Sequence, residues 1–522
     1  MNVAWWLEHA ADESPQRLAL VDGRGGEQLT YAELQARAQA LAAALRREGG
    51  VRPGDVVATL MGDDCWHTAL FYGVLRLGAT FSGFNRALHL EKFAMDAERS
   101  RVRVLVVGSD HVDVGRELLV RTGVERLLVC GPKVPDDLPD LRALSAAAAG
   151  ERVAMTLRTA EDIAAVNFTG GTSGVAKGVI FPHGRLGVSA QASLFYDRLT
   201  SRDVNLTVIS LCHSGGIHDA LKWVMARGTV ILSGGWDAEL CARLIREHGV
   251  TWIYFWVPTM IRDLMRRADY DDLPLQGVNA ILCGEPVGAE LERALLARGM
   301  KVSNSYGMTE SMPVGILKPL AAHGEPAPAG SCGRPIIELC ELVLKDPASG
   351  HRIEQPGVQG EICVRGGVIT PGYHNDPERT AEAFDEEGFL HTRDLAHVDE
   401  DGWYWVGGRT DDIINSGAEK LSLVEVEEML RRHPAVVDVA CIGVAHERFG
   451  EVPAAFVVGD VSAEELDHHC QVNLERWKRP RLYMLIPEIP RTLPKRTKDL
   501  ARLRAMLEGV VLPDEPGVRT QC

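Results

Sequence analysis

Long hydrophobic runs are missing from this sequence of 522 residues, although 46% of its residues are hydrophobic. A membrane-spanning helix needs about 20 consecutive apolar residues, so none is expected. The opening residues, MNVAWWLEHAADESP, have no basic cluster ahead of an apolar segment, and a secretory signal is not expected either. Because a domain usually has about 100–200 residues, these features predict a cytoplasmic protein with more than one domain.

Positive charge is also scarce, with 56 Lys and Arg against 72 Asp and Glu and a formal net charge of −16. General binding of nucleic acid requires clustered Lys and Arg and is therefore not expected, although a local basic pocket for a phosphorylated ligand is compatible with this balance. The eleven cysteines include no Cys-x-x-Cys pair. Their scatter favours reduced thiols over a disulfide framework or a zinc site.

Helical and strand patterns alternate through the first half of the chain, which predicts an α/β fold. Thr30 and Glu33 have the spacing of a capping box, and apolar residues follow at helical spacing as far as Leu45. Branched apolar runs at 56–60 and 102–107 predict buried strands. After about residue 330 the strands become shorter. The segment 402–408 predicts a hairpin, and a βαβ-like stretch is expected from a helix at 424–432 and strands at 436–444 and 454–458.

A glycine-rich segment follows an apolar strand at 163–168. It consists of Thr169, Gly170, Gly171, Thr172, Ser173, Gly174, Val175, Ala176, Lys177 and Gly178. Glycines let backbone N–H groups approach a ligand, while the hydroxyls and Lys177 add further donors, so the segment suits a polyphosphate. It is not a Walker A loop, which has Gly before its lysine and Ser or Thr after it.

This segment resembles the phosphate-binding signature of the adenylate-forming (ANL) superfamily, which includes acyl-CoA synthetases, adenylation domains of peptide synthetases and luciferases. Gly170 stands where that family usually has Ser, and Ala176 where it has Pro. Further motifs occur in the family's order, and the resemblance extends from Leu29 to about Arg502.

The segment 304–310 resembles the family's Tyr-Gly-x-Thr-Glu element. The resemblance implies that Tyr306 stacks on adenine, that Thr309 contacts phosphate and that Glu310 holds Mg²⁺. A carboxylate suits a hard cation that bridges phosphates. By the same resemblance, Gly284, Glu285 and Pro286 line the adenine.

The resemblance assigns further residues beyond position 390. Asp394, within Thr392-Arg393-Asp394, is expected to bind the ribose hydroxyls, although Arg393 replaces the family's Gly. Arg409 is expected to reach the nucleotide, Asp411 to act as a hinge, and Gly417 to line the tunnel for the thiol.

Two other family elements lie nearer the N-terminus. Pro371-Gly372-Tyr373 resembles one of them. His213 falls where many relatives have an aromatic residue or His beside the acyl carboxylate, so it is a candidate catalytic residue.

The family's catalytic lysine near the C-terminus has no exact counterpart. Pro490-Arg491-Thr492 matches the family anchor, but no Gly-Lys follows. We favour Lys495 as the cation that offsets charge between the two reacting anions, retain Lys498 as a second candidate, and treat Arg496 as a fallback.

The expected architecture is a large N-terminal domain of α/β layers, residues 1–410, with a small β-barrel-like subdomain, followed by a small mobile α+β domain, residues 411–522. The expected reaction joins a carboxylic acid to AMP from ATP with Mg²⁺, and then transfers the acyl group to CoA. One alternative is transfer to a carrier protein or an amine, and another is a degenerate member that performs one half-reaction. The acid is not identified, since the aromatic run 252–256 suits either an acyl pocket or a core.

Overall fold

The computed structural model describes residues 1–169, 177–284, 287–311, 317–318, 327–336, 339–410, 413–416, 419–491, 498–510 and 512. The chain divides into two compact units. The N-terminal unit comprises Met1–Leu342 and Val364–Leu390, and the C-terminal unit comprises Val343–Cys363 and His391–Cys522. The predicted domain boundary at residues 410 and 411 stays a prediction.

The first sheet of the N-terminal unit has seven strands in the order β13-β12-β11-β9-β10-β1-β2. They are β1 (Leu18–Asp22), β2 (Gln28–Thr30), β9 (Val204–Thr207), β10 (Thr229–Leu232), β11 (Trp252–Trp256), β12 (Asn279–Leu282) and β13 (Lys301–Asn304). All neighbours pair in parallel except β1 and β2. The carboxyl ends of β9, β11, β12 and β13 therefore lie along one edge, where open α/β sheets usually bind ligands.

The second sheet has six strands in the order β6-β5-β3-β4-β7-β8. They are β3 (Val56–Leu60), β4 (Thr80–Gly83), β5 (Val102–Val107), β6 (Arg126–Val129), β7 (Ile163–Thr169) and β8 (Lys177–Pro182). Pairing is parallel up to β7, which forms an antiparallel hairpin with β8. The predicted strands at 56–60 and 102–107 are confirmed as β3 and β5, and every residue of β3 is buried.

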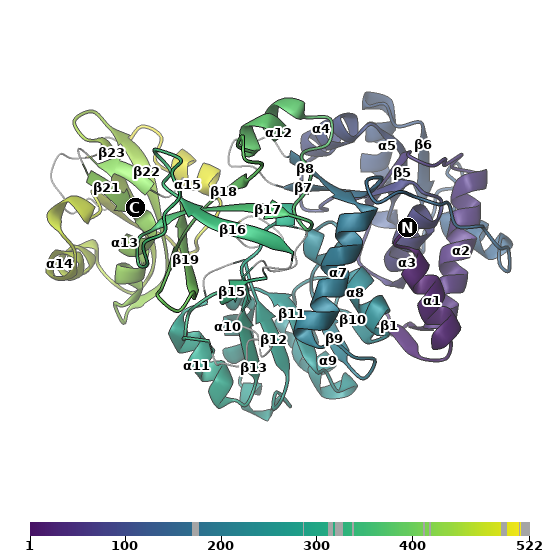
Figure 1. The fold of residues 1–522 in the computed structure, drawn as a ribbon, viewed down its shortest axis with the longest axis horizontal. Coiled ribbons are helices and arrows are strands. Elements are labelled where there is room, and N and C mark those ends of the chain that lie inside the picture. The colour runs from purple at the N-terminus through teal and green to yellow at the C-terminus, as the bar shows by residue number, and fades with distance from the viewer. Residues whose placement is uncertain are drawn as a thin grey trace. The chain divides into compact units, whose positions relative to one another are not determined.

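Twelve α-helices of this unit surround and separate the sheets in the described residues (Figure 1). They are α1 (Trp5–Glu13), α2 (Tyr31–Arg47), α3 (Cys65–Arg76), α4 (Leu90–Ser100), α5 (Val112–Arg121), α6 (Leu141–Ala147), α7 (His183–Asp197), α8 (Ser214–Ala226), α9 (Ala238–His248), α10 (Pro258–Met265), α11 (Ala289–Ala297) and α12 (Pro377–Ala383). The predicted capping box is confirmed at α2, where Thr30 accepts from the Glu33 N–H and Glu33 accepts from the Thr30 N–H.

The main core of the N-terminal unit joins its two sheets. It includes Phe81 and Ala165 from the second sheet, Val230 and Tyr254 from the first, and Ile217 and Leu221 from α8. Helix α8 is buried along most of its length and lies beside α7 (Figure 1). The start of α8 is thereby fixed near the carboxyl ends of the first sheet. Within the described residues, no helix is both long enough and apolar enough to span a membrane.

A four-stranded sheet, β16-β17-β18-β19, begins where the chain passes between the units. Its strands are β16 (Cys340–Lys345), β17 (Gly360–Gly366), β18 (Leu390–Val398) and β19 (Tyr404–Arg409), and two short strands, β14 (Leu317–Lys318) and β15 (Arg334–Pro335), precede it. The hairpin predicted at 402–408 is found only in part, because these residues form most of the second strand, β19, which pairs antiparallel with the earlier strand β18.

The remaining sheet of the C-terminal unit has the order β21-β20-β23-β22, with β24 beside β23. Its strands are β20 (Ile413–Ser416), β21 (Glu419–Ser422), β22 (Val436–His446), β23 (Gly450–Gly459) and β24 (Leu482–Leu485), and the helices of this unit are α13 (Leu423–Arg431), α14 (Ala463–Asn473) and α15 (Leu500–Ala505). The helix expected at 424–432 is α13. The two strands expected after it pair antiparallel as β22 and β23, and the parallel crossover is instead formed by β23, α14 and β24.

Candidate active site

Three predicted site residues follow strands of the first sheet. His213 lies beyond β9 and is the N-cap residue of α8, Gly284 follows β12, and Tyr306 follows β13. Because these strands are parallel, the three segments leave the sheet at the same edge. His213 and Tyr306 are both partly buried.

The glycine-rich segment lies at the tip of the β7–β8 hairpin. Thr169 and Lys177 are directly paired across the two strands, so their side chains stand at the mouth of the loop. Asn167 of β7 donates from its side-chain amide to the Cys212 carbonyl at 3.0 Å, and this bond joins the hairpin to the segment before His213. The predicted loop residues Gly170, Gly171, Thr172, Ser173 and Gly174 lie outside the described residues.

Thr309 and Glu310 belong to a short 3-10 helix, η3 (Thr309–Ser311), and only 6% and 7% of their surfaces are exposed. Ser311 stabilises this turn, because its hydroxyl accepts from the Met308 N–H at 3.0 Å and donates to the Met308 carbonyl at 2.9 Å. The hydroxyl of Ser214, the first residue of α8, donates to Thr309 Oγ1 at 3.5 Å. The turn therefore contacts the helix that begins after His213.

Tyr373 connects Glu310 to the glycine-rich hairpin. Its phenolic hydroxyl donates to Glu310 Oε1 at 3.0 Å, and Lys177 Nζ lies 4.8 Å from the centroid of its ring. The backbone around Tyr373 pairs with β8, since Val179 and Tyr373 form an antiparallel bridge. Gly372 has a φ of +146°, and a Cβ there would lie 2.5 Å from Thr380, so this close approach requires glycine.

We call Lys177, Tyr373, Glu310, Thr309 and Ser214 the central polar cluster. Its members come from β8, the segment before α12, η3 and α8. The cluster places a lysine cation and a carboxylate on opposite parts of one tyrosine, with two hydroxyls beside them. This set offers a cation and hydroxyl donors to phosphate oxygens, and a carboxylate oxygen that suits Mg²⁺.

Asp394 and Arg409 meet in the C-terminal unit. Arg409 Nη1 donates to Asp394 Oδ1 at 2.6 Å, across paired positions of β18 and β19. The Asp394 side chain is 15% exposed and that of Arg409 is 40% exposed, so both are accessible. The Asp394 N–H donates to the Thr392 hydroxyl at 3.1 Å, and this hydroxyl donates in turn to the Ile362 carbonyl at 2.8 Å.

Arg393 has a φ of +61°. Residues other than glycine rarely adopt this left-handed conformation. A glycine, which the resemblance places at this position, would adopt the same φ without that strain.

Lys498 forms an ion pair with Glu427 of α13 inside the C-terminal unit. The Glu427 side chain is only 4% exposed, and its Oε1 also accepts from the Cys441 N–H at 2.7 Å. Lys498 therefore serves the packing of α13 against β22. Lys495, Arg496, Asp411 and Gly417, together with Glu285 and Pro286 beside Gly284, lie outside the described residues.

Neither Tyr373 nor Ser214 is among the site residues predicted from the sequence. The signal for Tyr373 is the Pro-Gly-Tyr element, which occurs in the family's order and needs glycine at its centre. Ser214 has the weaker signal of its position directly after His213.

Comparison with known proteins identifies the family of this chain. The model of the AMP-binding enzyme family matches residues 7–374, and that of the AMP-binding enzyme C-terminal domain matches residues 425–495. The chain is 30% identical to a 2-succinylbenzoate–CoA ligase of Bacillus cereus over 94% of its own length and 96% of that protein. It is also 30% identical to 4-coumarate–CoA ligase 3 of Oryza sativa subsp. japonica, over 95% of this chain and 91% of the relative.

The fold is likewise that of a solved relative. ATP-bound MatB from Rhodopseudomonas palustris superposes with a TM-score of 0.87 at 26% identity, covering 98% of this chain and 100% of that one. The predicted fold class, family and ligase class are thereby confirmed. The chain belongs to the AMP-binding enzyme family, and the two curated relatives named above, which it matches over almost its whole length, are CoA ligases.

Proposed function

We propose that this chain is an AMP-forming acid–thiol ligase that converts an aromatic carboxylic acid to its CoA thioester. In the first step the carboxylate attacks the α-phosphate of ATP, which forms an acyl-adenylate and releases pyrophosphate. In the second step the CoA thiol attacks the acyl carbon, and AMP leaves. The observation that carries the proposal is the central polar cluster, in which residues from four separate segments of the chain make contact.

The cluster supplies the charges that the first step needs. Lys177 would neutralise phosphate oxygens, and the hydroxyls of Thr309 and Ser214 would donate to them. Glu310 would hold Mg²⁺ between the phosphates, with Tyr373 fixing the orientation of its carboxylate. Phosphoryl chemistry of this kind depends on positioning and charge neutralisation, which agrees with a site built from fixed polar groups.

Asp394 and Arg409 would bind the ribose. An aspartate accepts hydrogen bonds from two vicinal hydroxyls, and its existing bond to Arg409 holds one carboxylate oxygen in place. The aromatic face of Tyr306, beyond the end of β13, would stack on the adenine.

Lys495 would supply the catalytic cation from the C-terminal unit. One observation supports this choice over Lys498, because Lys498 is already paired with the buried Glu427. We also propose that the small C-terminal domain rotates about Asp411 and that the two domains divide at residues 410 and 411. A cytoplasmic location is part of the same proposal.

The acyl pocket is proposed to lie between β11 and the first turn of α8. Phe255 has a φ of +61° at an irregularity of β11, a strained conformation of the kind that concentrates at functional sites. A Cβ on Gly215 would lie 3.2 Å from Cδ2 of the Phe255 ring. The ring centroids of His218 and Phe255 are 5.9 Å apart. Aromatic side chains facing a helix that starts with small residues suit a flat aryl group. The names of the two curated relatives support this, since 2-succinylbenzoate and 4-coumarate are both aromatic acids.

The test is ATP–pyrophosphate exchange with matched acids, such as phenylacetate against cyclohexylacetate and benzoate against cyclohexanecarboxylate. We expect exchange with aromatic members at least tenfold faster than with their saturated counterparts. Equal rates would contradict the aromatic assignment, and no exchange with any acid would contradict adenylation. Mass analysis of the product with CoA then tests the acceptor, because thioester formation with a carrier protein but not with CoA would favour the alternative acceptor.

A further inference from the structure

We propose that Glu361, Cys363 and His391 form a zinc-binding site in the C-terminal unit, with one coordination position left open to solvent. No residue of this group belongs to the central polar cluster or to the ribose pair. The site does not depend on the proposed reaction.

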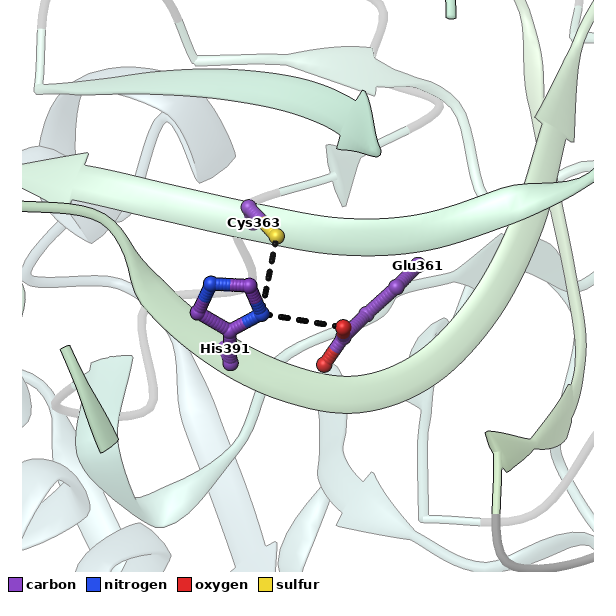
Figure 2. A group of neighbouring side chains, drawn as sticks. All are labelled: Glu361, Cys363 and His391. Carbon is purple, nitrogen blue, oxygen red and sulfur yellow. Dashed lines mark hydrogen bonds and ion pairs between the residues drawn. The ribbon is translucent and has the colours of Figure 1, made fainter. Parts of the chain in front are cut away.

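Strand geometry brings the three side chains together. Glu361 and Cys363 are two residues apart on β17, so their side chains point to the same face of the sheet. His391 lies on the neighbouring strand β18, and its ring faces both of them (Figure 2). His391 Nδ1 is 2.9 Å from Glu361 Oε2 and 3.6 Å from Cys363 Sγ.

The sulfur–nitrogen separation matches that of a tetrahedral zinc site, and the shorter oxygen–nitrogen separation is that of a hydrogen bond, so the carboxylate would move away by about 0.5 Å when zinc binds. Standard zinc–ligand distances place a nitrogen and an oxygen ligand about 3.4 Å apart, and a sulfur and a nitrogen ligand about 3.6 Å apart. The three ligand atoms here all lie within 4.8 Å of one another. Across the part of the chain that the structure describes, this is the one group of three such side chains with that property.

The surroundings fit a metal site with an accessible position. Glu361 is 6% exposed and Cys363 is fully buried, whereas the His391 side chain is 31% exposed. The second oxygen of Glu361, Oε1, accepts from the Arg393 N–H at 2.8 Å, and this bond holds the carboxylate with Oε2 toward the histidine. Such outer hydrogen bonds are typical of metal ligands, because they fix ligand orientation.

The donor set selects the metal. A thiolate, an imidazole and one carboxylate suit Zn²⁺, whereas Ca²⁺ and Mg²⁺ sites are built from oxygen ligands. Three protein ligands leave a fourth position, which water can reach past the exposed edge of His391. The metal would link β17 to β18 immediately before Thr392, Arg393 and Asp394. It would thereby stabilise the part of β18 that contains Asp394.

The test uses the full-length chain without ATP, after removal of metal by a chelator and dialysis. Zn²⁺ titration is expected to give one site per chain. Co²⁺ is expected to show the strong visible bands of tetrahedral coordination and a thiolate-to-cobalt charge-transfer band. Cys363→Ala should abolish the charge-transfer band, and Cys363→Ala and His391→Asn should each weaken Zn²⁺ binding at least tenfold.

Cys441→Ala is the matched control, since it removes another buried thiol of the same unit, and it should bind Zn²⁺ as the unaltered chain does. Circular dichroism checks folding, and His391→Asn provides the test if Cys363→Ala does not fold, because His391 is partly exposed. The absence of stoichiometric binding would overturn the proposal. Unchanged Zn²⁺ binding in both Cys363→Ala and His391→Asn would also overturn it. Loss of binding only in His469→Ala, which alters a separate group of histidines on and near α14, would overturn it as well.

Discussion

The two units hold their predicted nucleotide-binding residues in different ways. In the N-terminal unit, Thr309 and Glu310 are buried and are positioned by hydrogen bonds to Ser214 and Tyr373. In the C-terminal unit, Asp394 is paired with Arg409, whose side chain is 40% exposed. Buried hydrogen-bonded groups are fixed before a ligand binds, whereas an ion pair with a solvent-exposed member is held more weakly. Changes in the first group should therefore reduce the rate of adenylation most, and changes in the second unit should separate the half-reactions or alter stability.

The largest effect is expected for Glu310→Gln. Loss of a group that stabilises developing charge typically lowers the rate about 10²–10³-fold, and we expect pyrophosphate exchange to fall by that factor. Glu292→Gln is the control, because Glu292 is also 7% exposed and is not part of the cluster. Its carboxylate accepts a hydrogen bond of 2.7 Å from the Gly330 N–H. Equal losses in both variants would contradict a specific role for Glu310.

Lys495→Ala should lower pyrophosphate exchange about 10²-fold, because a cation between two anions is lost. Thioester formation from a synthetic acyl-adenylate and CoA should change less than threefold. Both half-reactions are measured separately, with Lys498→Ala as the control. Equal loss of rate in the two half-reactions would contradict the assignment of Lys495. If only Lys498→Ala slowed adenylation without slowing thioester formation, Lys498 would be the catalytic cation instead.

Tyr373→Phe should lower exchange about tenfold, because a hydrogen bond to a charged group contributes about 1.5–3 kcal/mol. The matched control is Tyr72→Phe, which removes a hydroxyl that donates to the Ala220 carbonyl at 2.6 Å within the same unit. We expect it to lower thermal stability without a comparable change in exchange. If Tyr373→Phe left the rate of pyrophosphate exchange unchanged, the hydrogen bond from Tyr373 would not be needed to orient the Glu310 carboxylate.

Lys498→Ala should destabilise the C-terminal unit by about 1–3 kcal/mol, since it removes a partner of the buried Glu427 carboxylate. Urea unfolding measures this change. Glu427→Gln combined with Lys498→Ala should cost less than the sum of the single changes, because the two residues are in contact. Additive costs would contradict the ion pair.

The smallest effect is expected for Arg393→Gly. A left-handed residue other than glycine costs about 1–2 kcal/mol, which the greater entropy loss of glycine partly offsets. We therefore expect a gain in unfolding free energy of less than about 1 kcal/mol, measured by urea titration. A loss above that value would contradict the strain at this position.

Local signals in the sequence predicted much of the fold. The capping box of Thr30 and Glu33 and the strands β3 and β5 follow from neighbouring residues, whose spacing is visible in the sequence. The order of family motifs predicted His213, Lys177, Tyr306 and Glu310 as site residues, and parallel strands bring most of their segments to one edge.

Contacts between distant segments could not be predicted from spacing. Tyr373 reaches Glu310 because its segment pairs with β8, and Lys498 meets Glu427 because α13 packs on β22. The group of Glu361, Cys363 and His391 depends on the pairing of two strands, and no Cys-x-x-Cys spacing indicates it. Phe255 adopts positive φ through tertiary packing, which overrides the local preference of a phenylalanine.

The most direct test of the central polar cluster is a crystal structure of the full chain with Mg²⁺ and a non-hydrolysable ATP analogue. We expect a metal ion about 2.0–2.1 Å from a carboxylate oxygen of Glu310, with phosphate oxygens within hydrogen-bonding distance of Lys177 Nζ and Thr309 Oγ1. A nucleotide whose metal and phosphates are bound away from these three residues would contradict it.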